Sequence, residues 1–306
     1  MSKIVRCIST DGLVMAAAID STDIVKEAAR VHHTTPVMTS ALGRLLTGAS
    51  IMGSMLKEEK ASMTIRIKGE GPAGALIAVA ESNGNVRGYA ENPGLLIMPD
   101  ENKNLNVRGA VGSKGVLSVI KDFGSGEPYV GQIPLASGEI AEDLAYYYGI
   151  SEQIPTVFAL GVNFDEKWNF SRAGGCFIQL LPAADEREIL KVEECIKHIK
   201  PITQMLAEGF KTEEICRAVL PDFELEVLDE FEVEYHCPCS LDRVYRSLAT
   251  LSSEDIETLA GEDGYAEVCC HFCDAVYNIN QEELNALAEA KRNEKLKVTN
   301  DGWNAD

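Results

Sequence analysis

The alternation of apolar and polar residues predicts a front half that is built mainly from strands. Apolar and β-branched runs over residues 3–10 and 13–20 flank Asp11-Gly12, a dipeptide that favours a two-residue hairpin turn. Between residues 61 and 182 the pattern is again that of strands, with one further helix expected over residues 139–150, and turn-forming residues separate the successive runs. We therefore expect antiparallel hairpins in both stretches.

Two helices are expected between these sets of hairpins. One begins at Ser21 or Thr22, either of which can act as an N-cap, and a second runs from Pro36, which is favoured at a first helical position, to about Leu56. Small and apolar residues cover most of the circumference of the second helix, which predicts that it is buried. Helices grouped between hairpins, without strand–helix–strand alternation, favour an α+β core domain over residues 1–182, with hairpin-rich sheets and buried helices.

Residues 183–235 have the pattern of a linker and not of a domain. One helical face collects apolar side chains opposite a charged face, and its residues are Ile189, Val192, Cys195, Ile196 and Ile199. Pro201, Gly209 and Pro221 interrupt the stretch, and a run of alternating apolar and acidic residues ends it. Such a segment is too apolar for a free tether and too interrupted to hold a core of its own. We expect an amphipathic, metastable linker that is docked on another part of the protein.

Composition places the chain among globular proteins. Its 306 residues and 33.3 kDa exceed the usual size of one domain, so more than one folded unit is expected. Apolar residues make up 45%, charged residues 25%, and the mean hydropathy is -0.06, which excludes a disordered or fibrous chain. Neither the apolar segment of a secretion signal nor a membrane-spanning run is recognisable. We expect a cytoplasmic protein without a membrane partner.

The charge is negative and unevenly distributed. Twenty-eight basic residues against 48 acidic ones leave a net charge of -20, which disfavours nucleic acid as a partner because its phosphates would be repelled. Residues 1–180 hold 16 basic and 19 acidic residues, whereas residues 181–306 hold 12 and 29. Eight of the nine cysteines lie beyond residue 175. In a reducing compartment these are metal ligands, buried thiols or redox groups.

Four of these cysteines form two close pairs that are 30 residues apart, Cys237-Pro238-Cys239 and Cys270-His271-Phe272-Cys273. Tetrahedral zinc needs four ligands, and thiolates are soft donors that suit it. Alternate residues of an extended chain point to the same face, and Pro238 favours an extended Cys237, so both sulfurs of the first pair can reach one ion. The second pair lies in a turn between two β-rich flanks, and the residues between the pairs predict two short helices, one capped by Ser240 and one by Ser252 or Ser253. The spacing predicts a small zinc domain over residues 236–306, with one Zn²⁺ per chain on Cys237, Cys239, Cys270 and Cys273.

Nearby residues leave alternatives for this ligand set. His236 and His271 are candidate replacement ligands. Cys269 competes with Cys270, but neighbouring side chains of a strand point apart, so Cys269 should face away from the metal. The remaining cysteines lie in apolar strands or on helix faces, where buried and inert thiols are expected; these are Cys7, Cys176, Cys195 and Cys216.

Three functions fit such a centre. The zinc can be purely structural, in a constitutive adaptor for other proteins. Cys270 and Cys273 can serve a thiol-disulfide oxidoreductase, although their place between strands and among acids lacks the helix N-terminus that usually activates such a pair. The third is redox control, because a thiolate-only centre in an acidic region depends on its metal. A small domain that owes about 10–16 kcal/mol of folding energy to zinc should unfold when its ligands are oxidised.

The chain resembles the redox-regulated 33-kDa heat-shock chaperone family, the HslO-type chaperonins. The C-x-C pair followed by C-x-x-C after 30 residues is the specific part of this resemblance. Front segments also look like family segments, namely GRLLTGASIMGSMLK, IRIKGEGPAGAL, SEQIPT and GGCFIQLLP. The resemblance covers nearly the whole chain, and Cys269 together with the cysteines outside the motif departs from the pattern.

The resemblance implies an ATP-independent holdase and not an enzyme. In the reduced state the four motif cysteines would bind one Zn²⁺ and the chaperone would be inactive. Oxidants would form the disulfides Cys237–Cys239 and Cys270–Cys273, zinc would leave, and the loosened linker would uncover apolar surface for unfolded or partially folded client proteins. The resemblance further implies a homodimer on activation.

Overall fold

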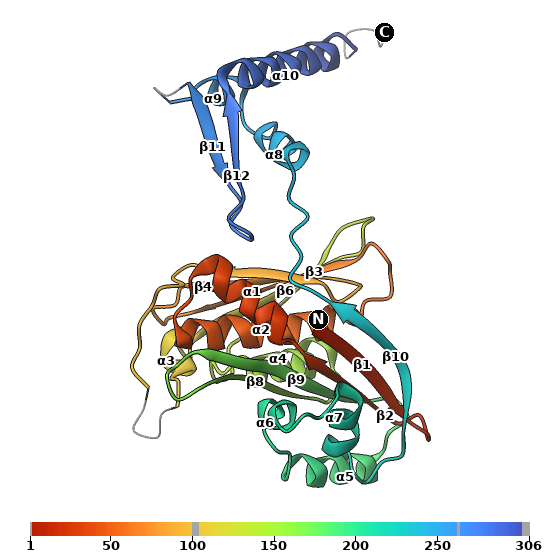
Figure 1. Ribbon diagram of the computed structural model, residues 1–306. Coiled ribbons are helices and arrows are strands. Elements are labelled where there is room, and N and C mark those ends of the chain that lie inside the picture. Colours follow the sequence, from red (N-terminus) through yellow and green to blue (C-terminus); the bar gives the residue numbers. More distant parts are fainter. Residues whose placement is uncertain (1, 100–103, 262–263, 302–306) are drawn as a thin grey trace. The chain divides into compact units, whose positions relative to one another are not determined.

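The computed structural model describes residues 2–99, 104–261 and 264–301, with side chains up to residue 293. The chain forms two compact units, Met1–His236 (unit 1) and Cys237–Asp306 (unit 2) (Figure 1).

Unit 1 contains two five-stranded sheets in which every neighbouring pair of strands is antiparallel. Sheet A has the order β10-β1-β2-β9-β8, and sheet B has the order β5-β4-β3-β6-β7. The strands of sheet A are β1 (Ser2–Ser9), β2 (Val14–Asp20), β8 (Thr156–Phe164), β9 (Phe170–Leu180) and β10 (Leu225–Val233). Those of sheet B are β3 (Ser62–Gly69), β4 (Ala75–Glu81), β5 (Val86–Ala90), β6 (Gly115–Asp122) and β7 (Tyr129–Pro134).

Helices lie between and beside these sheets: α1 (Thr22–His32), α2 (Pro36–Ser54), α3 (Val107–Val111), α4 (Ala141–Tyr147) and the π-helical turn η1 (Tyr148–Glu152). Helix α2 packs on β4 and β5 of sheet B and on β8 and β9 of sheet A, and nearly all of its residues are buried (Figure 1). Gly53 permits the close approach to sheet B, since a Cβ at this position would lie 2.7 Å from the Cβ of Ala80 on β4. The expected α+β fold with hairpin-rich sheets and a buried helix is confirmed.

The first hairpin forms as expected, but its connection is longer than two residues. Residues 10–13 join β1 to β2, and Gly12 adopts a positive φ of +73° within them. Ser9 explains the difference, because its hydroxyl accepts hydrogen bonds from the backbone N–H groups of Leu13 and Val14 at 3.1 and 2.9 Å. The backbone N–H groups of the longer connection therefore have partners, and a two-residue turn is not needed to satisfy them.

The stretch after β9 is docked on sheet A. It forms the helices α5 (Glu186–Ile196), α6 (Ile202–Ala207) and α7 (Thr212–Val219), of which α6 packs on β8 and β9 and α7 on β1 and β2. Their buried apolar residues form a second core with one face of the sheet. In β1, Ile4 belongs to the core around α2, whereas Val5 and Cys7 face the linker helices. Alternation along one strand therefore serves two cores.

Strand β10 continues the linker along the edge of sheet A. It pairs with β1 from Leu225 opposite Ser9 to Val233 opposite Ser2. Two ion pairs strengthen this edge, Arg6–Asp229 and Lys3–Glu230. Beyond β10 the chain reaches sheet B, where Tyr235 and Val86 of β5 form a parallel bridge and the Tyr235 hydroxyl donates to the carbonyl of Gly88 at 2.8 Å.

Unit 2 contains the helices α8 (Leu241–Leu248), α9 (Ser253–Glu257) and α10 (Gln281–Asp301) and the hairpin β11 (Tyr265–Cys269)–β12 (Val276–Asn280). The hydroxyls of Ser240 and Ser252 cap α8 and α9, as the sequence predicts. The core is small and consists of Val244, Leu248, Ile256, Ala266, Ile279, Leu284 and Ala288. Helix α10, which supplies the last two, is not expected from the sequence pattern. In the described parts of both units, no helix combines the length and apolar character that crossing a membrane requires.

Candidate metal centre

The two cysteine pairs lie on different kinds of backbone in unit 2. Cys237 and Cys239 occupy an irregular stretch just before α8. Cys270 and Cys273 lie in the turn between β11 and β12, where the N–H of Cys273 donates to the carbonyl of Cys270 at 3.3 Å. The N–H of Asp274 donates to the same carbonyl at 2.9 Å, and Asp274 adopts a positive φ of 56°. The turn between β-rich flanks therefore exists as expected, and it holds its two sulfurs on one side.

The fold brings the sulfurs of both pairs together. The Sγ atoms of Cys237, Cys239, Cys270 and Cys273 all lie within 4.8 Å of one another. The distance is 3.7 Å between the sulfurs of Cys237 and Cys270 and 3.2 Å between those of Cys239 and Cys273. Tetrahedral zinc with Zn–S bonds of about 2.3 Å would set neighbouring sulfurs about 3.8 Å apart. A four-thiolate zinc centre therefore fits both the donor set and its spacing.

Tyr277 on β12 is a neighbour of this centre that the sequence did not single out. Its hydroxyl donates to the sulfur of Cys239 at 3.1 Å. That hydrogen bond raises the pKa of Tyr277 to about 12, because the hydroxyl can donate to the sulfur only while it keeps its proton. The only signal in the sequence was an aromatic residue in the strand after the turn, which is common in strands of any kind.

The thiols of Cys237, Cys239 and Cys273 do not ionise equally. Burial raises the pKa of Cys237 to about 11 and raises that of Cys273 further. Burial also opposes ionisation of Cys239, but hydrogen bonds from the Tyr277 hydroxyl and the neighbouring thiols outweigh it and lower its pKa. Four adjacent thiolates would repel one another without a cation, so metal binding must displace protons from the cluster.

The other candidate ligands lie outside the cluster. Among the described residues, the group that can hold a metal contains neither His236 nor His271. Cys269 is exposed and its thiol interacts with the Glu267 carboxylate at 3.7 Å, so the alternation of strand side chains correctly predicts that it faces away. The four remaining cysteines are all buried in unit 1, as expected, and they are Cys7, Cys176, Cys195 and Cys216.

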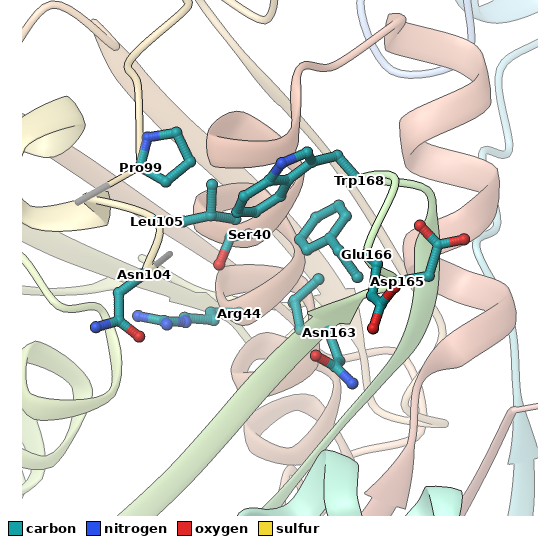
Figure 2. A pocket seen from close by; sticks show the side chains of 11 residues that line it. Ser40, Arg44, Pro99, Asn104, Leu105, Asn163, Asp165, Glu166 and Trp168 are labelled. Atoms are coloured by element: carbon teal, nitrogen blue, oxygen red, sulfur yellow. The ribbon is translucent and has the colours of Figure 1, made fainter. Parts of the chain in front are cut away.

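A separate hollow of about 600 Å³ lies in unit 1 beside α2 and the β8–β9 turn (Figure 2). Two of its charged groups are engaged in the fold: Arg44 donates to Glu139 at 2.8 Å, and Asp165 accepts the backbone N–H groups of Lys167 and Asn169. Hydrogen bonds from the side chain and backbone of Asn169 lower the pKa of Asp165. The carboxylate therefore serves to shape the turn.

Comparisons with known proteins converge on one family. The model of the Hsp33 protein family matches residues 2–280. The 33 kDa chaperonin of Clostridioides difficile is 45% identical over 281 residues, which are 92% of this chain and 96% of the relative. That of Agathobacter rectalis is 43% identical over 284 residues, which are 93% of this chain and 98% of the relative.

A solved structure agrees with these relatives. The crystal structure of the 33 kDa chaperonin (heat shock protein 33 homolog) from Thermotoga maritima matches with a TM-score of 0.86 and 32% sequence identity. The match covers 95% of this chain and 99% of that one. The similarity in sequence and in fold therefore extends over both units.

Proposed function

This chain belongs to the Hsp33 family, and from that premise we propose that it is a redox-regulated, ATP-independent holdase whose switch is the four-cysteine centre. One observation carries the proposal: in the described part of unit 2, four cysteine sulfurs lie within 4.8 Å of one another, and the cluster contains no other type of donor atom. Thiolates bind zinc tightly, and they are also the side chains that oxidants convert to disulfides. One cluster can therefore bind a metal and sense an oxidant.

In the reduced state Cys237, Cys239, Cys270 and Cys273 would hold one Zn²⁺ per chain. The ion would offset two of the four thiolate charges and tie the stretch before α8 to the β11–β12 turn. The core of unit 2 is small, so this cross-link would supply much of its stability. The reduced protein would then keep its linker docked and bind clients poorly.

Oxidation would convert the same sulfurs to the disulfides Cys237–Cys239 and Cys270–Cys273. Each disulfide removes two of the four donors, so the centre loses its affinity for the metal. Two close sulfur contacts in the cluster join different motifs, Cys237 with Cys270 at 3.7 Å and Cys239 with Cys273 at 3.2 Å. All four are in mutual reach, however, so this spacing does not select a pairing by itself.

The surface that activation would uncover lies under the linker. We assign residues 1–182 to the chaperone core, 183–235 to the metastable linker and 236–306 to the switch. The linker helices cover one apolar face of sheet A, which holds Val5, Val14 and Ile178. Undocking would expose this face and the apolar side of the helices together. Contiguous apolar surface of this kind binds unfolded or partially folded proteins.

The remaining parts of the proposal concern the cellular setting. We place the protein in the cytoplasm, as a homodimer once activated, with unfolding proteins and not nucleic acid or membrane as its partners. The net charge of -20 is consistent with this choice, because it repels phosphate polymers. Client binding requires no chemical turnover, so we assign no catalytic residue.

One experiment tests the proposal against its alternatives. Zinc content and suppression of client aggregation are measured on the full chain before and after peroxide treatment. A redox holdase loses zinc and gains activity, whereas an adaptor keeps both unchanged, and an oxidoreductase reduces a disulfide substrate catalytically without suppressing aggregation. Cys273→Ser should lose zinc when reduced, and Cys269→Ser is the matched control because its thiol lies outside the cluster.

A further inference from the structure

A second group of thiols lies in unit 1, where the linker meets sheet A. Cys7 on β1, Cys176 on β9 and Cys216 on α7 all have an exposed fraction of 0%. They belong to the apolar core that the linker helices share with the sheet. None of them belongs to the metal cluster in unit 2.

Two of these three thiols are in direct contact across the interface. The side chains of Cys7 and Cys216 share a thiol–thiol hydrogen bond. The sulfur of Cys216 also lies 3.9 Å from the carbonyl oxygen of Val5, which places it directly over β1. Helix α7 packs on β1 and β2 along its length, so the pair joins a linker helix to the strand that begins the core.

The surroundings make the two thiols chemically unequal. The hydrogen bond from Cys216, aided by the charge of the neighbouring Arg217, lowers the pKa of Cys7 even though burial opposes this. The same hydrogen bond and burial raise the pKa of Cys216. Cys176 differs from both, because burial raises its pKa to about 12 and no thiol hydrogen bond compensates. Cys7 is thus the thiol of the three that is best prepared to attack an oxidant.

We propose that Cys7 and Cys216 are a second redox pair, whose disulfide ties helix α7 of the linker to strand β1. The disulfide itself depends on the packing of α7 on sheet A, and its effect on clients rests on the proposed function.

The oxidant for this step is hydrogen peroxide, a small uncharged molecule that can enter during a local opening of the linker. The Cys7 thiolate attacks one peroxide oxygen, which breaks the O–O bond and gives a sulfenic acid and water after proton uptake. The sulfur of Cys216 then attacks the Cys7 sulfur, the S–S bond forms, and a second water leaves. In total, two thiols and one hydrogen peroxide give one disulfide and two waters.

This disulfide would act against the one at the metal centre. Oxidation of the centre releases the linker, whereas a Cys7–Cys216 disulfide would hold its third helix on the sheet. The disulfide has to form while α7 is still docked, because undocking separates the two sulfurs. Oxidation before release would therefore restrain activation, and oxidation after release would not.

Mapping of disulfide-linked peptides tests the proposal directly. The zinc-bound, unsubstituted full-length chain is used, because its linker is docked when the oxidant is added, and peptide mapping distinguishes a Cys7–Cys216 disulfide from disulfides within the centre. After treatment with hydrogen peroxide and alkylation, we expect a cross-linked peptide that contains Cys7 and Cys216. Alkylated, unlinked Cys7 and Cys216, or a cross-link from either one to Cys176, would overturn the proposal.

The effect on the linker is tested in the chain with its centre intact. Proteolysis within residues 183–235 after peroxide treatment should be about tenfold faster in Cys7→Ala and in Cys216→Ala than in the unsubstituted chain, because no tether holds α7. Cys176→Ala is the matched control, since it removes an equally buried thiol but leaves the pair, and it should cleave at the unsubstituted rate. Equal cleavage of all four chains would overturn the restraining role. Zinc release measured in the same samples reports separately on the proposed function.

Discussion

The hydroxyl of Tyr277 illustrates what a single side chain contributes to the metal centre. Residues that donate hydrogen bonds to metal ligands fix the orientation of the ligand and adjust its basicity. Tyr277 does this for Cys239, at 3.1 Å. At this scale the centre has five contributors and not four.

Tyr277→Phe should weaken zinc binding by about tenfold, since removal of such a neighbour commonly lowers metal affinity by 10- to 100-fold. Competition with a chromogenic chelator measures the change. Tyr245→Phe is the control, because its hydroxyl bonds to Glu283 in the same unit and not to a ligand. Equal affinities in the two variants would show that the Tyr277 hydrogen bond has no influence on the metal.

The residues of the centre were predictable to different degrees. The spacing of Cys237, Cys239, Cys270 and Cys273 predicts the cluster because metal ligation constrains where ligands lie along the chain. Strand alternation predicts that Cys269 faces outwards. Tyr277 and the Cys7–Cys216 contact were not predictable, because both depend on packing between segments that no local pattern connects.

Among the elements, α7 shows how the linker is held. Ile215 on this helix is fully buried against sheet A, whereas Leu190 on α5 is 59% exposed. Ile215→Ala should destabilise docking by about 2–5 kcal/mol, because it leaves a cavity in a packed core. We expect faster proteolysis of the linker in the reduced protein and partial chaperone activity without oxidant. Leu190→Ala is the control, and a similar response in both variants would contradict the role of packing.

The two cysteine motifs should close in a fixed order, with Cys270–Cys273 first. A disulfide needs Cα atoms about 4.4–6.8 Å apart. The C-x-x-C pair lies in a turn in which the backbone N–H of Cys273 already donates a hydrogen bond to the carbonyl of Cys270. In an extended C-x-C pair the Cα atoms lie near the upper limit, at about 6.6 Å, and Pro238 restricts bending. Mass spectrometry of alkylated samples taken during mild oxidation measures the order. Detection of Cys237–Cys239 while Cys270 and Cys273 are still free thiols would contradict it.

Element types were more predictable than their limits and partners. Capping residues and apolar periodicity correctly predict α8, α9 and the strands of both sheets. The pattern missed α10, because among its described side chains, which end at residue 293, only Leu284 and Ala288 are buried, and its sequence has the composition of a charged tail. The Asp11-Gly12 turn is longer than predicted, since the Ser9 hydroxyl accepts hydrogen bonds from the N–H groups of Leu13 and Val14.

For the molecule as a whole, the two units should differ in their dependence on metal. Among the residues that the structure describes, unit 1 has two large cores, whereas unit 2 has one small core. Removal of zinc by a chelator should therefore unfold unit 2 and leave the sheets of unit 1 intact. Hydrogen exchange measures this by region: the amides of β11 and β12 should lose protection while those of β2 and β9 keep it. Retained protection in β11 and β12 would mean that the fold of unit 2 does not depend on its metal.

Strand β10 has a consequence for the solubility of the protein itself. The outer strand of a sheet presents unpaired backbone groups that can recruit the same strand of another molecule. β10 occupies that position in sheet A and carries acidic residues at Glu226, Glu230 and Glu232, which repel a second copy. β1, which it covers, has no acidic residue from Ser2 to Ser9. A chain that releases β10 thus gives up its own protection against edge-to-edge aggregation, and a captured client or a second subunit at that edge would restore it.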